Sequence, residues 1–329
     1  MGRVFMLGAS GTIGQATVRA LLRRGHEVVC LVRPRAGVGG RLDAAALAAR
    51  LAGAELRFGD ACDPDSQTRD GWRSERFDAL MSCLASRTGA PRDAWAVDHA
   101  AHHHALAAAQ AAGVRHVVLL SALCVQKPRL AFQQAKLAFE RELMASPLAW
   151  SIVRPTAFFK SLSGQVDRVR RGKPFLLFGD GRLTACKPIS DDDLADYLAD
   201  CLHDPMRQCQ VLPIGGPGPA MTPREQGELL FEALGLTPRF SHVPVGLMDA
   251  VVGGLALLGR LWPAAADKAE LARIGRYYAT ESMLVLDPIT GDYEERLTPS
   301  TGRQTLAQFY AALARGQVAP PERGDHAVF

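Results

Sequence analysis

The sequence predicts an α/β fold, in which a doubly wound parallel sheet is followed by a smaller C-terminal substrate-binding domain. Short apolar runs alternate with stretches of helical periodicity through the first half of the chain, and the first run leads directly into a glycine-rich turn. Since this alternation ends near residue 157, we expect an NADP-binding domain at residues 1–157 and a mainly substrate-binding domain at 158–329. Segments at about 175–215 are candidates to return to the first sheet.

Residues 3–33 are expected to form a strand, a turn, a helix and a second strand. The apolar run at 4–7 is typical of a strand covered on both faces. The following GxxGxxG turn stands in a Rossmann-type context, where glycines let the backbone approach a diphosphate at a helix N-terminus. The alternative is a structural turn without a ligand. The expected cofactor-binding residues of the turn are Gly8, Ser10, Gly11, Thr12, Ile13 and Gly14.

The second strand, at residues 27–32, runs into Arg33-Pro34-Arg35. Proteins that bind NAD carry an acidic residue in this region, about 20 residues beyond the turn, which holds the ribose 2′-hydroxyl. Arginines suit a 2′-phosphate instead, so Arg33 and Arg35 favour NADPH as the cofactor. The alternative is that both arginines lie in a solvated loop.

The third and fourth strands, at 55–58 and 79–84, should end beside the same cofactor. Asp60 and Ala61 follow the third strand and are expected near the adenine. For Asp60 the alternative is a cap on the helix after Pro64. Leu84 and Ala85, at the end of the fourth strand, are expected to lie along the cofactor.

The helix at 94–112 contains four histidines, at positions 99, 102, 103 and 104. His99 and His103 have the i, i+4 spacing of a metal pair. Because no acidic HExxH signature accompanies them, and because a crossover helix normally shows such residues to solvent, we expect exposed histidines and no metal site.

The fifth strand, at 116–120, ends at Ser121, and the next helix carries Lys136. Short-chain reductases have a YxxxK motif on this helix, but Phe132 stands where the tyrosine would be. A phenyl ring cannot donate a proton, which argues against reduction of a carbonyl by a tyrosine acid. Lys136 can still hold the nicotinamide ribose and keep a positive charge near the reacting centre. The alternative is a solvated helix residue.

The sixth strand, at 150–153, leads into a turn at Pro155. We expect Pro155 and Phe158 to lie against the nicotinamide, and Phe158 and Phe159 to face the substrate. Both aromatic rings could equally be core residues. Short strands are expected at 175–177 and 186–189, followed by a helix whose first turn, Asp191-Asp192-Asp193, favours the helix dipole.

The apolar stretch at 245–262 is interrupted by Asp249 and Arg260 and is too short to span a bilayer. We expect a buried or pocket-lining helix here. The alternative is a helix lying on a membrane surface, which would allow weak association with membranes.

The composition is that of an ordinary globular protein, with 48% hydrophobic and 22% charged residues in a chain of 329. A net charge of +4 gives no indication of nucleic-acid binding. The seven cysteines include no CxxC pair, which argues against an iron–sulfur or zinc centre and favours a reducing, cytoplasmic compartment. With the first strand starting at Arg3, we expect no signal or transit peptide.

The motif GASGTIG, together with Arg33, Ser121 and Lys136, resembles the NmrA-like, atypical short-chain dehydrogenases. Longer segments resemble the NADPH-dependent divinyl (proto)chlorophyllide 8-vinyl reductases more narrowly. These segments are CLASRTGAPRDAW (83–95), LAFQQAKLAFE (130–140), FGDGRLTACKPISDDDLA (178–195), YYATESMLVLDP (277–288) and TPSTG (298–302).

The resemblance implies an oxidoreductase that reduces the 8-vinyl group of a magnesium tetrapyrrole to ethyl, during the chlorophyll or bacteriochlorophyll biosynthesis of photosynthesis. It implies NADPH as the hydride donor, Lys136 and Ser121 as catalytic residues, and Tyr277 or Tyr278 as substrate-binding residues and candidate proton donors. A vinyl group offers no carbonyl oxygen to protonate, so Phe132 costs this chemistry little. Plant members carry a transit peptide, which points to a bacterial, cytoplasmic protein here. The alternatives are an NADPH reductase of the isoflavone or benzylic-ether type and a non-catalytic NADP sensor.

Overall fold

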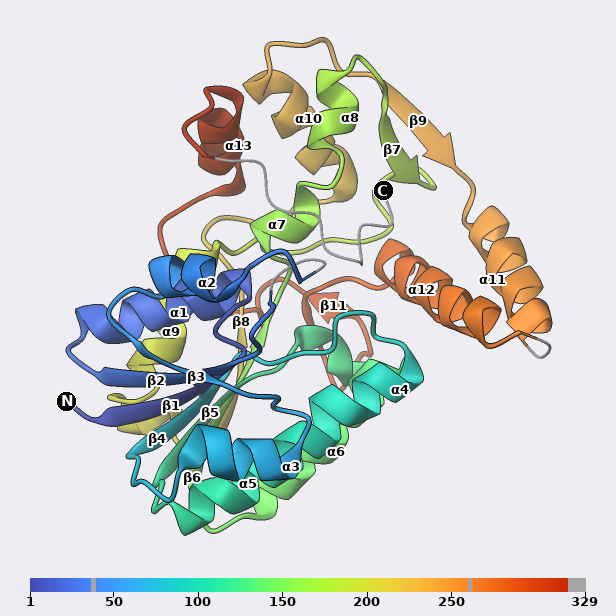
Figure 1. Cartoon of the computed structure of the whole chain (residues 1–329). Coiled ribbons are helices and arrows are strands. Elements are labelled where there is room, and N and C mark those ends of the chain that lie inside the picture. The colour runs from blue at the N-terminus through green and yellow to red at the C-terminus, as the bar shows by residue number, and fades with distance from the viewer. Residues whose placement is uncertain (37–39, 260–261, 319–329) are drawn as a thin grey trace. The chain divides into compact units, whose positions relative to one another are not determined.

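The computed structural model describes residues 1–36, 40–259 and 262–318 (Figure 1). Contacts divide the chain into two compact units. The first unit contains Met1–Pro155 and Asp191–Leu212, and the second contains Thr156–Ser190 and the chain from Pro213 onward. The chain therefore leaves the first unit after one long segment and returns to it for a short one.

The first unit is built on a seven-stranded sheet with the strand order β3-β2-β1-β4-β5-β6-β8. Its central pairs, β1 with β2 and β4, and β5 with β4 and β6, are parallel, as is the pair of β2 with β3. The predicted α/β, Rossmann-type fold is confirmed. The strands are β1 (Arg3–Leu7), β2 (Glu27–Val32), β3 (Glu55–Phe58), β4 (Ala79–Ser82), β5 (His116–Leu120), β6 (Ala149–Pro155) and β8 (Gln210–Ile214).

Helices cover both faces of this sheet. Figure 1 shows α1 and α9 together on one face and α5 and α6 on the other. The helical elements of the unit are α1 (Thr12–Arg23), α2 (Ala44–Arg50), α3 (Pro64–Ser66), η2 (Gln67–Trp72), α4 (Pro91–Ala94), η3 (Trp95–Ala101), α5 (His102–Ala111), η4 (Leu123–Gln126), α6 (Ala131–Ala145), α9 (Asp191–Asp200) and η5 (Pro205–Arg207). Of these, η2 and η3 are π-helical.

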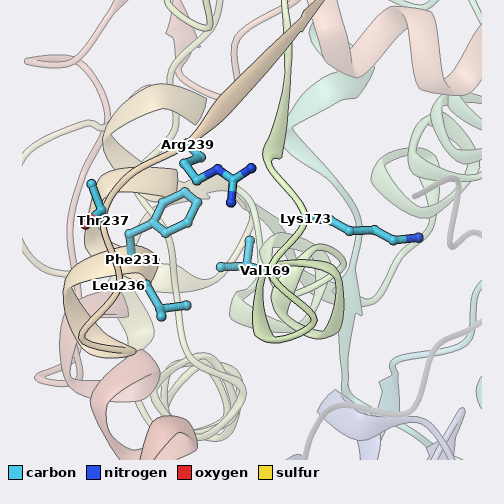
Figure 2. A pocket seen from close by; sticks show the side chains of 7 residues that line it. Val169, Lys173, Phe231, Leu236, Thr237 and Arg239 are labelled. Carbon is cyan, nitrogen blue, oxygen red and sulfur yellow. The ribbon is translucent and has the colours of Figure 1, made fainter.

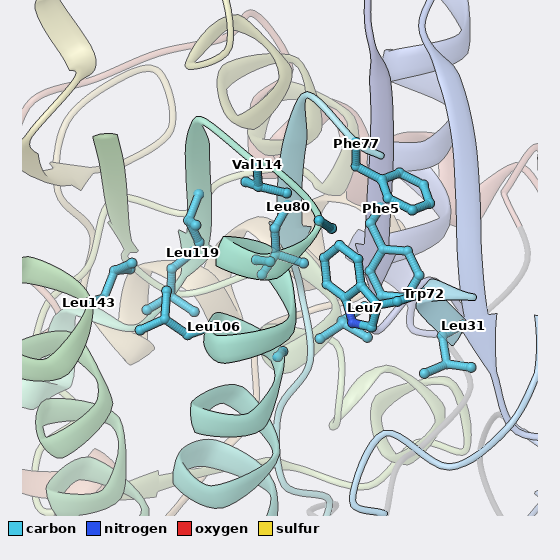
Figure 3. Close-up of a cluster of buried hydrophobic side chains, with 14 of the residues drawn as sticks. Phe5, Leu7, Leu31, Trp72, Phe77, Leu80, Leu106, Val114, Leu119 and Leu143 are labelled. Atoms are coloured by element: carbon cyan, nitrogen blue, oxygen red, sulfur yellow. The ribbon is translucent and has the colours of Figure 1, made fainter. Parts of the chain in front are cut away.

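The core between the sheet and α5 explains why the strands read as unbroken apolar runs. Phe5 of β1 stacks on Trp72 with ring centroids 3.9 Å apart, and Phe77 meets both rings edge-on. Leu80 and Leu119, from neighbouring strands, extend the same cluster (Figure 3). Because the opposite face is covered as well, residues 4–7 of β1 are buried without alternation.

Acidic residues along α9 form ion pairs with basic residues of α1 and its C-cap. Asp192 forms an ion pair with Arg19 of α1 at 2.9 Å. Further along α9, Asp196 and Asp200 both accept from Arg24, at 2.8 and 2.7 Å. The acidic face of α9 therefore meets the basic face of α1, which joins the returning segment to the first unit.

The second unit contains two small sheets and six helices among the described residues. β7 (Phe175–Phe178) and β9 (Phe240–Val243) are parallel, whereas β10 (Val285–Leu286) and β11 (Tyr293–Glu294) are antiparallel. The strand expected at 186–189 is wrong, because Cys186 and Ile189 form only isolated bridges. The helices are α7 (Phe159–Leu162), α8 (Val166–Arg170), α10 (Pro223–Ala233), α11 (Val245–Gly259), α12 (Pro263–Thr280) and α13 (Leu306–Ala314).

Helix α11 shows that the helix expected at 245–262 to be buried or pocket-lining is not buried. None of its residues is buried, and Leu247 and Leu258 are 56% and 45% exposed. Its neighbour is α12, where Arg276 forms an ion pair with Asp249. Arg260 lies outside the described residues. None of the helices within the described ranges is long and apolar enough to cross a membrane.

Candidate active site

The glycine turn after β1 is shaped by close backbone contacts. Gly8 has a φ of +76°, and a Cβ there would lie 2.4 Å from the carbonyl carbon of Cys83. A Cβ on Gly14 would lie 2.1 Å from the carbonyl oxygen of Gly8. In contrast, a Cβ on Gly11 would meet only the Gly8 oxygen, at 3.6 Å. The first and third glycines are therefore required by packing within the protein, whereas the middle one leaves its side open.

This open side lies at the N-terminus of α1. Gly11 is the N-cap residue and supplies no capping side chain, so a ligand can use the first-turn N–H groups and the positive end of the helix dipole. These features fit a dinucleotide diphosphate. Arg33 and Arg35 are both exposed just after β2, where a 2′-phosphate could reach them.

Asp60 forms a local turn after β3. Its Oδ1 accepts a hydrogen bond from the N–H of Cys62 at 2.9 Å. The helix after Pro64 is capped by Asp63, whose side chain accepts from Asp65, so the alternative capping role for Asp60 is wrong. Ala61 follows in the turn, and its carbonyl oxygen accepts a hydrogen bond from the side-chain amide of Gln67.

Ser121 is buried at the end of β5 and is tied to a carboxylate. Its hydroxyl donates to Glu140 of α6 at 2.5 Å. The Glu140 side chain is fully buried and also forms an ion pair with Arg154 of β6. The proton of the Ser121 hydroxyl is thus used within the protein, which leaves its oxygen lone pairs as the means of contacting a ligand. Sequence reasoning missed Glu140, although it lies one turn beyond Lys136.

Lys136 is not a solvated helix residue, because it is only 9% exposed. Its Nζ lies 2.9 Å from Oδ1 of Asp98, in the π-helical turn η3. The same oxygen accepts from the N–H of Ser86 at 3.2 Å. Asp98 was also missed from the sequence, although burial of a lysine ammonium calls for an anionic partner.

The sequence predicts that all four histidines are exposed. This prediction is wrong for His102. His102 is buried, and burial together with the nearby Lys136 charge lowers its pKa to about 4. Because a carbonyl can only accept, Nδ1 of the neutral ring donates to the Val97 oxygen at 2.9 Å. The Ser82 hydroxyl then donates to Nε2, at 2.8 Å.

His99 and His103 share a different partner, Glu142 of α6. The distances from their ring nitrogens to the Glu142 carboxylate are 2.6 and 2.8 Å. Burial opposes ionisation of Glu142, but these hydrogen bonds outweigh it and lower its pKa. The part of the chain that the structure describes contains no group of three or more ligands able to hold a metal ion.

The expected substrate-facing aromatic residues have different surroundings in the second unit. Phe159 is a core residue whose ring lies 5.2 Å from that of Phe309, whereas Phe158 is partly exposed and forms a bridge with Ile189. On α12, Tyr277 is buried and Tyr278 is 44% exposed. Their rings meet edge-on at 5.7 Å.

A small hollow in the second unit contains none of the expected site residues. Its volume is about 210 Å³, and it is lined by residues of α8, the loop that follows α8, α10 and the segment before β9 (Figure 2). Phe231 and Arg239 lie on one side, while Lys173 extends away from the others (Figure 2). Its volume is below the range of about 300–1,000 Å³ that is typical of small-molecule sites.

Comparisons with known proteins identify the fold and the family of this chain. A family model described as NAD(P)H-binding matches residues 8–205. The structure resembles that of an NADPH-dependent quinone oxidoreductase from Escherichia coli complexed with NADPH, with a TM-score of 0.65 and 19% identity over 94% of this chain and 99% of that one. At this identity the likeness concerns the fold alone.

Two curated relatives share the name divinyl chlorophyllide a 8-vinyl-reductase, chloroplastic. The protein from Oryza sativa subsp. indica is 51% identical over 331 residues, which cover 99% of this chain and 82% of the relative. The protein from Arabidopsis thaliana is 47% identical, over 98% of this chain and 79% of the relative. With about half of its residues identical over nearly its whole length, this chain belongs to the divinyl chlorophyllide a 8-vinyl-reductase family.

Proposed function

We propose that this protein uses NADPH to reduce the 8-vinyl group of a divinyl chlorophyllide or protochlorophyllide to an ethyl group. The observation that carries the proposal is the 51% identity with the rice relative over 99% of the chain. The identity extends through both compact units, and therefore beyond the nucleotide-binding turn that many unrelated reductases share. It favours this reaction over an isoflavone-type reductase and over a non-catalytic NADP sensor.

NADPH, when bound, supplies the hydride. The protein's part is to hold the cofactor, and several features support this role for the residues expected from the sequence. The open side of Gly11 and the N-terminus of α1 suit the diphosphate, and the exposed Arg33 and Arg35 suit the 2′-phosphate. Leu84 and Ala85, after β4, and Pro155, at the end of β6, stand at the carboxyl ends of strands, where ligands bind in doubly wound sheets.

The chemistry suits a vinyl group better than a carbonyl. Reduction of a conjugated vinyl group needs a hydride and a proton on carbon, and the macrocycle can delocalise the negative charge that develops between the two steps. A phenolic acid at position 132 is therefore not required. Asp98 balances the charge of Lys136, so the pair adds no net positive charge to the site. We therefore assign Lys136 mainly to holding the nicotinamide ribose, with its ammonium group giving only a local positive potential. Of the two candidate proton donors on α12, Tyr278 has the more accessible side chain.

The direct test is anaerobic incubation of the purified protein with NADPH and divinyl chlorophyllide, and then with divinyl protochlorophyllide. We expect the Soret band and the chromatographic retention of the pigment to become those of the monovinyl product. Reactions without NADPH, or with NADH in its place, serve as controls. Tight NADPH binding without conversion of either pigment would contradict the proposed function.

The cellular setting is part of the same proposal. The seven cysteines, all of which lie in the part of the chain that the structure describes, form no disulfide, which supports a reducing compartment. We place the protein in the bacterial cytoplasm, where its product would enter chlorophyll or bacteriochlorophyll synthesis. Disruption of its gene should make divinyl pigments accumulate, and unchanged pigments would contradict this role in pigment synthesis.

A further inference from the structure

The two carboxylate oxygens of Asp98 differ in their hydrogen bonding. Its side chain is fully buried. Oδ1 accepts from both the Lys136 ammonium and the Ser86 N–H, whereas Oδ2 is buried and has no hydrogen-bond partner within the described residues. Buried carboxylate oxygens in native proteins are almost always hydrogen-bonded, because loss of water is otherwise uncompensated. The unused oxygen therefore indicates a donor that arrives with a ligand.

The position of Asp98 in the fold indicates which ligand this is. Through Ser86, Asp98 contacts the loop that follows β4, at the carboxyl end of the sheet. Through Lys136, it contacts the residue expected to hold the nicotinamide ribose. A ribose offers hydroxyl groups, which are hydrogen-bond donors suited to a carboxylate. The π-helical turn that carries Asp98 is itself a kind of element found often at functional sites.

The surroundings hold Asp98 in place before a ligand binds. His102 donates to the carbonyl of Val97, which directly precedes Asp98, and accepts from Ser82 at the end of β4. The Ser82 oxygen in turn accepts from the N–H of Leu84, at 3.3 Å. Both the turn and the loop are thus fixed to the end of β4, so Asp98 already has a defined position in the absence of a ligand.

We infer that Asp98 is a cofactor-binding and positioning residue. One oxygen holds the Lys136 ammonium in place, and the other accepts a hydrogen bond from a hydroxyl of the nicotinamide ribose of NADPH. This inference rests on the proposed use of NADPH, but not on the identity of the pigment.

The test is a binding cycle between the protein and the cofactor, carried out without pigment. The full-length protein and its Asp98→Asn variant are titrated with NADPH and with analogues that lack the 2′- or the 3′-hydroxyl of the nicotinamide ribose. Asparagine keeps the shape of the side chain but removes its charge. We expect the wild type to lose about 10- to 100-fold in affinity for one of the two analogues, as for a hydrogen bond to a charged group. Because a neutral amide forms a weaker hydrogen bond with a hydroxyl than a carboxylate does, the variant should discriminate much less than the wild type between NADPH and that analogue.

Asp93→Asn provides a matched control, because Asp93 lies close by on α4 but accepts from Arg87 and Thr88 instead. This variant should retain the wild-type discrimination between NADPH and the analogue. If Asp98→Asn loses as much affinity as the wild type when the hydroxyl is removed, the two changes are independent and the inference is overturned. Coupling between Asp98 and the hydroxyl in a protein that converts no pigment would support Asp98 while refuting the proposed reaction.

Discussion

Lys136 is a buried cation whose charge is balanced by a buried anion, which alters what its removal should do. In an exposed setting, Lys136→Ala would change activity and little else. Here it would leave Asp98 without its ammonium partner in a site that excludes water. Loss of one partner from a buried ion pair typically costs about 3–5 kcal/mol.

We therefore predict that Lys136→Ala lowers the free energy of unfolding by about 3–5 kcal/mol as well as abolishing turnover. The double variant Lys136→Met/Asp98→Leu removes both charges and should recover most of the stability, but none of the activity. Urea denaturation and pigment turnover measure the two effects separately. A stable and active Lys136→Ala would exclude the lysine from both roles.

The buried histidines predict a loss of stability in acid. Burial lowers the pKa of both His102 and His116 to about 4, from an ordinary value of 6.5. Between these pH values the unfolded chain binds more protons than the folded one, so stability falls as the pH is lowered from 6.5 toward 4. The loss is on the order of 3 kcal/mol for each histidine.

His102→Gln keeps an acceptor for Ser82 but removes the titrating ring, so it should weaken the dependence of stability on pH. Gln110→Ala, at an exposed and non-titrating position of the same helix, should leave that dependence unchanged. Urea denaturation at several pH values between 4 and 7 provides the comparison. Parallel curves for the two variants would show that His102 contributes nothing to acid unfolding.

At the scale of elements, different glycines of the turn serve protein stability and cofactor binding. Gly14→Ala would place a Cβ 2.1 Å from the Gly8 oxygen and should destabilise the protein by about 3 kcal/mol. Gly11→Ala has room within the protein, so it should change stability by less than about 0.5 kcal/mol while weakening NADPH binding at least tenfold. Thermal unfolding and cofactor titration measure the two effects. Unimpaired NADPH binding by Gly11→Ala would show that the diphosphate does not approach this glycine.

Helix α11 should tolerate polar substitutions that a core helix would not. Since no residue of α11 is buried, Leu247→Gln and Leu258→Gln should each change the free energy of unfolding by less than about 0.5 kcal/mol. Leu230→Ala in α10, whose side chain is fully buried, should cost about 2–5 kcal/mol. Equal costs in the two helices would show that α11 is covered in solution.

The elements differ in how well the sequence predicts them, for a physical reason. The parallel strands and the glycine turn can be predicted from short stretches of sequence, because burial on both faces and tight backbone contacts restrict which residues can follow one another. The partners of Lys136 and Ser121 depend instead on contacts between distant elements, so Asp98 and Glu140 were missed. Burial of α11 was predicted from apolar composition alone, but burial also requires a neighbour on each apolar face.

At the scale of the whole molecule, the first unit is discontinuous in sequence. It needs α9 and most of β8, which follow an excursion of 35 residues, Thr156–Ser190, into the second unit. Helix α9 contributes Leu194 and Leu198 to the core, in addition to the ion pairs with α1. Without α9, the first unit would lose about 1.5–3 kcal/mol of burial from each of these leucines, and Arg24 would lose two carboxylate partners.

We therefore predict that residues 1–155 alone do not fold cooperatively. The same residues joined to 191–212 by a flexible linker of about ten residues should unfold in a single transition and bind NADPH. Circular dichroism during urea denaturation reports on folding, and the change in NADPH fluorescence reports on binding. A matched fusion in which Leu194 and Leu198 are both replaced by Asp should behave like residues 1–155 alone, because the returning helix could no longer pack. Cooperative unfolding and NADPH binding by residues 1–155 would mean that the nucleotide-binding domain ends where strand–helix alternation ends, and that α9 is an addition to a complete fold.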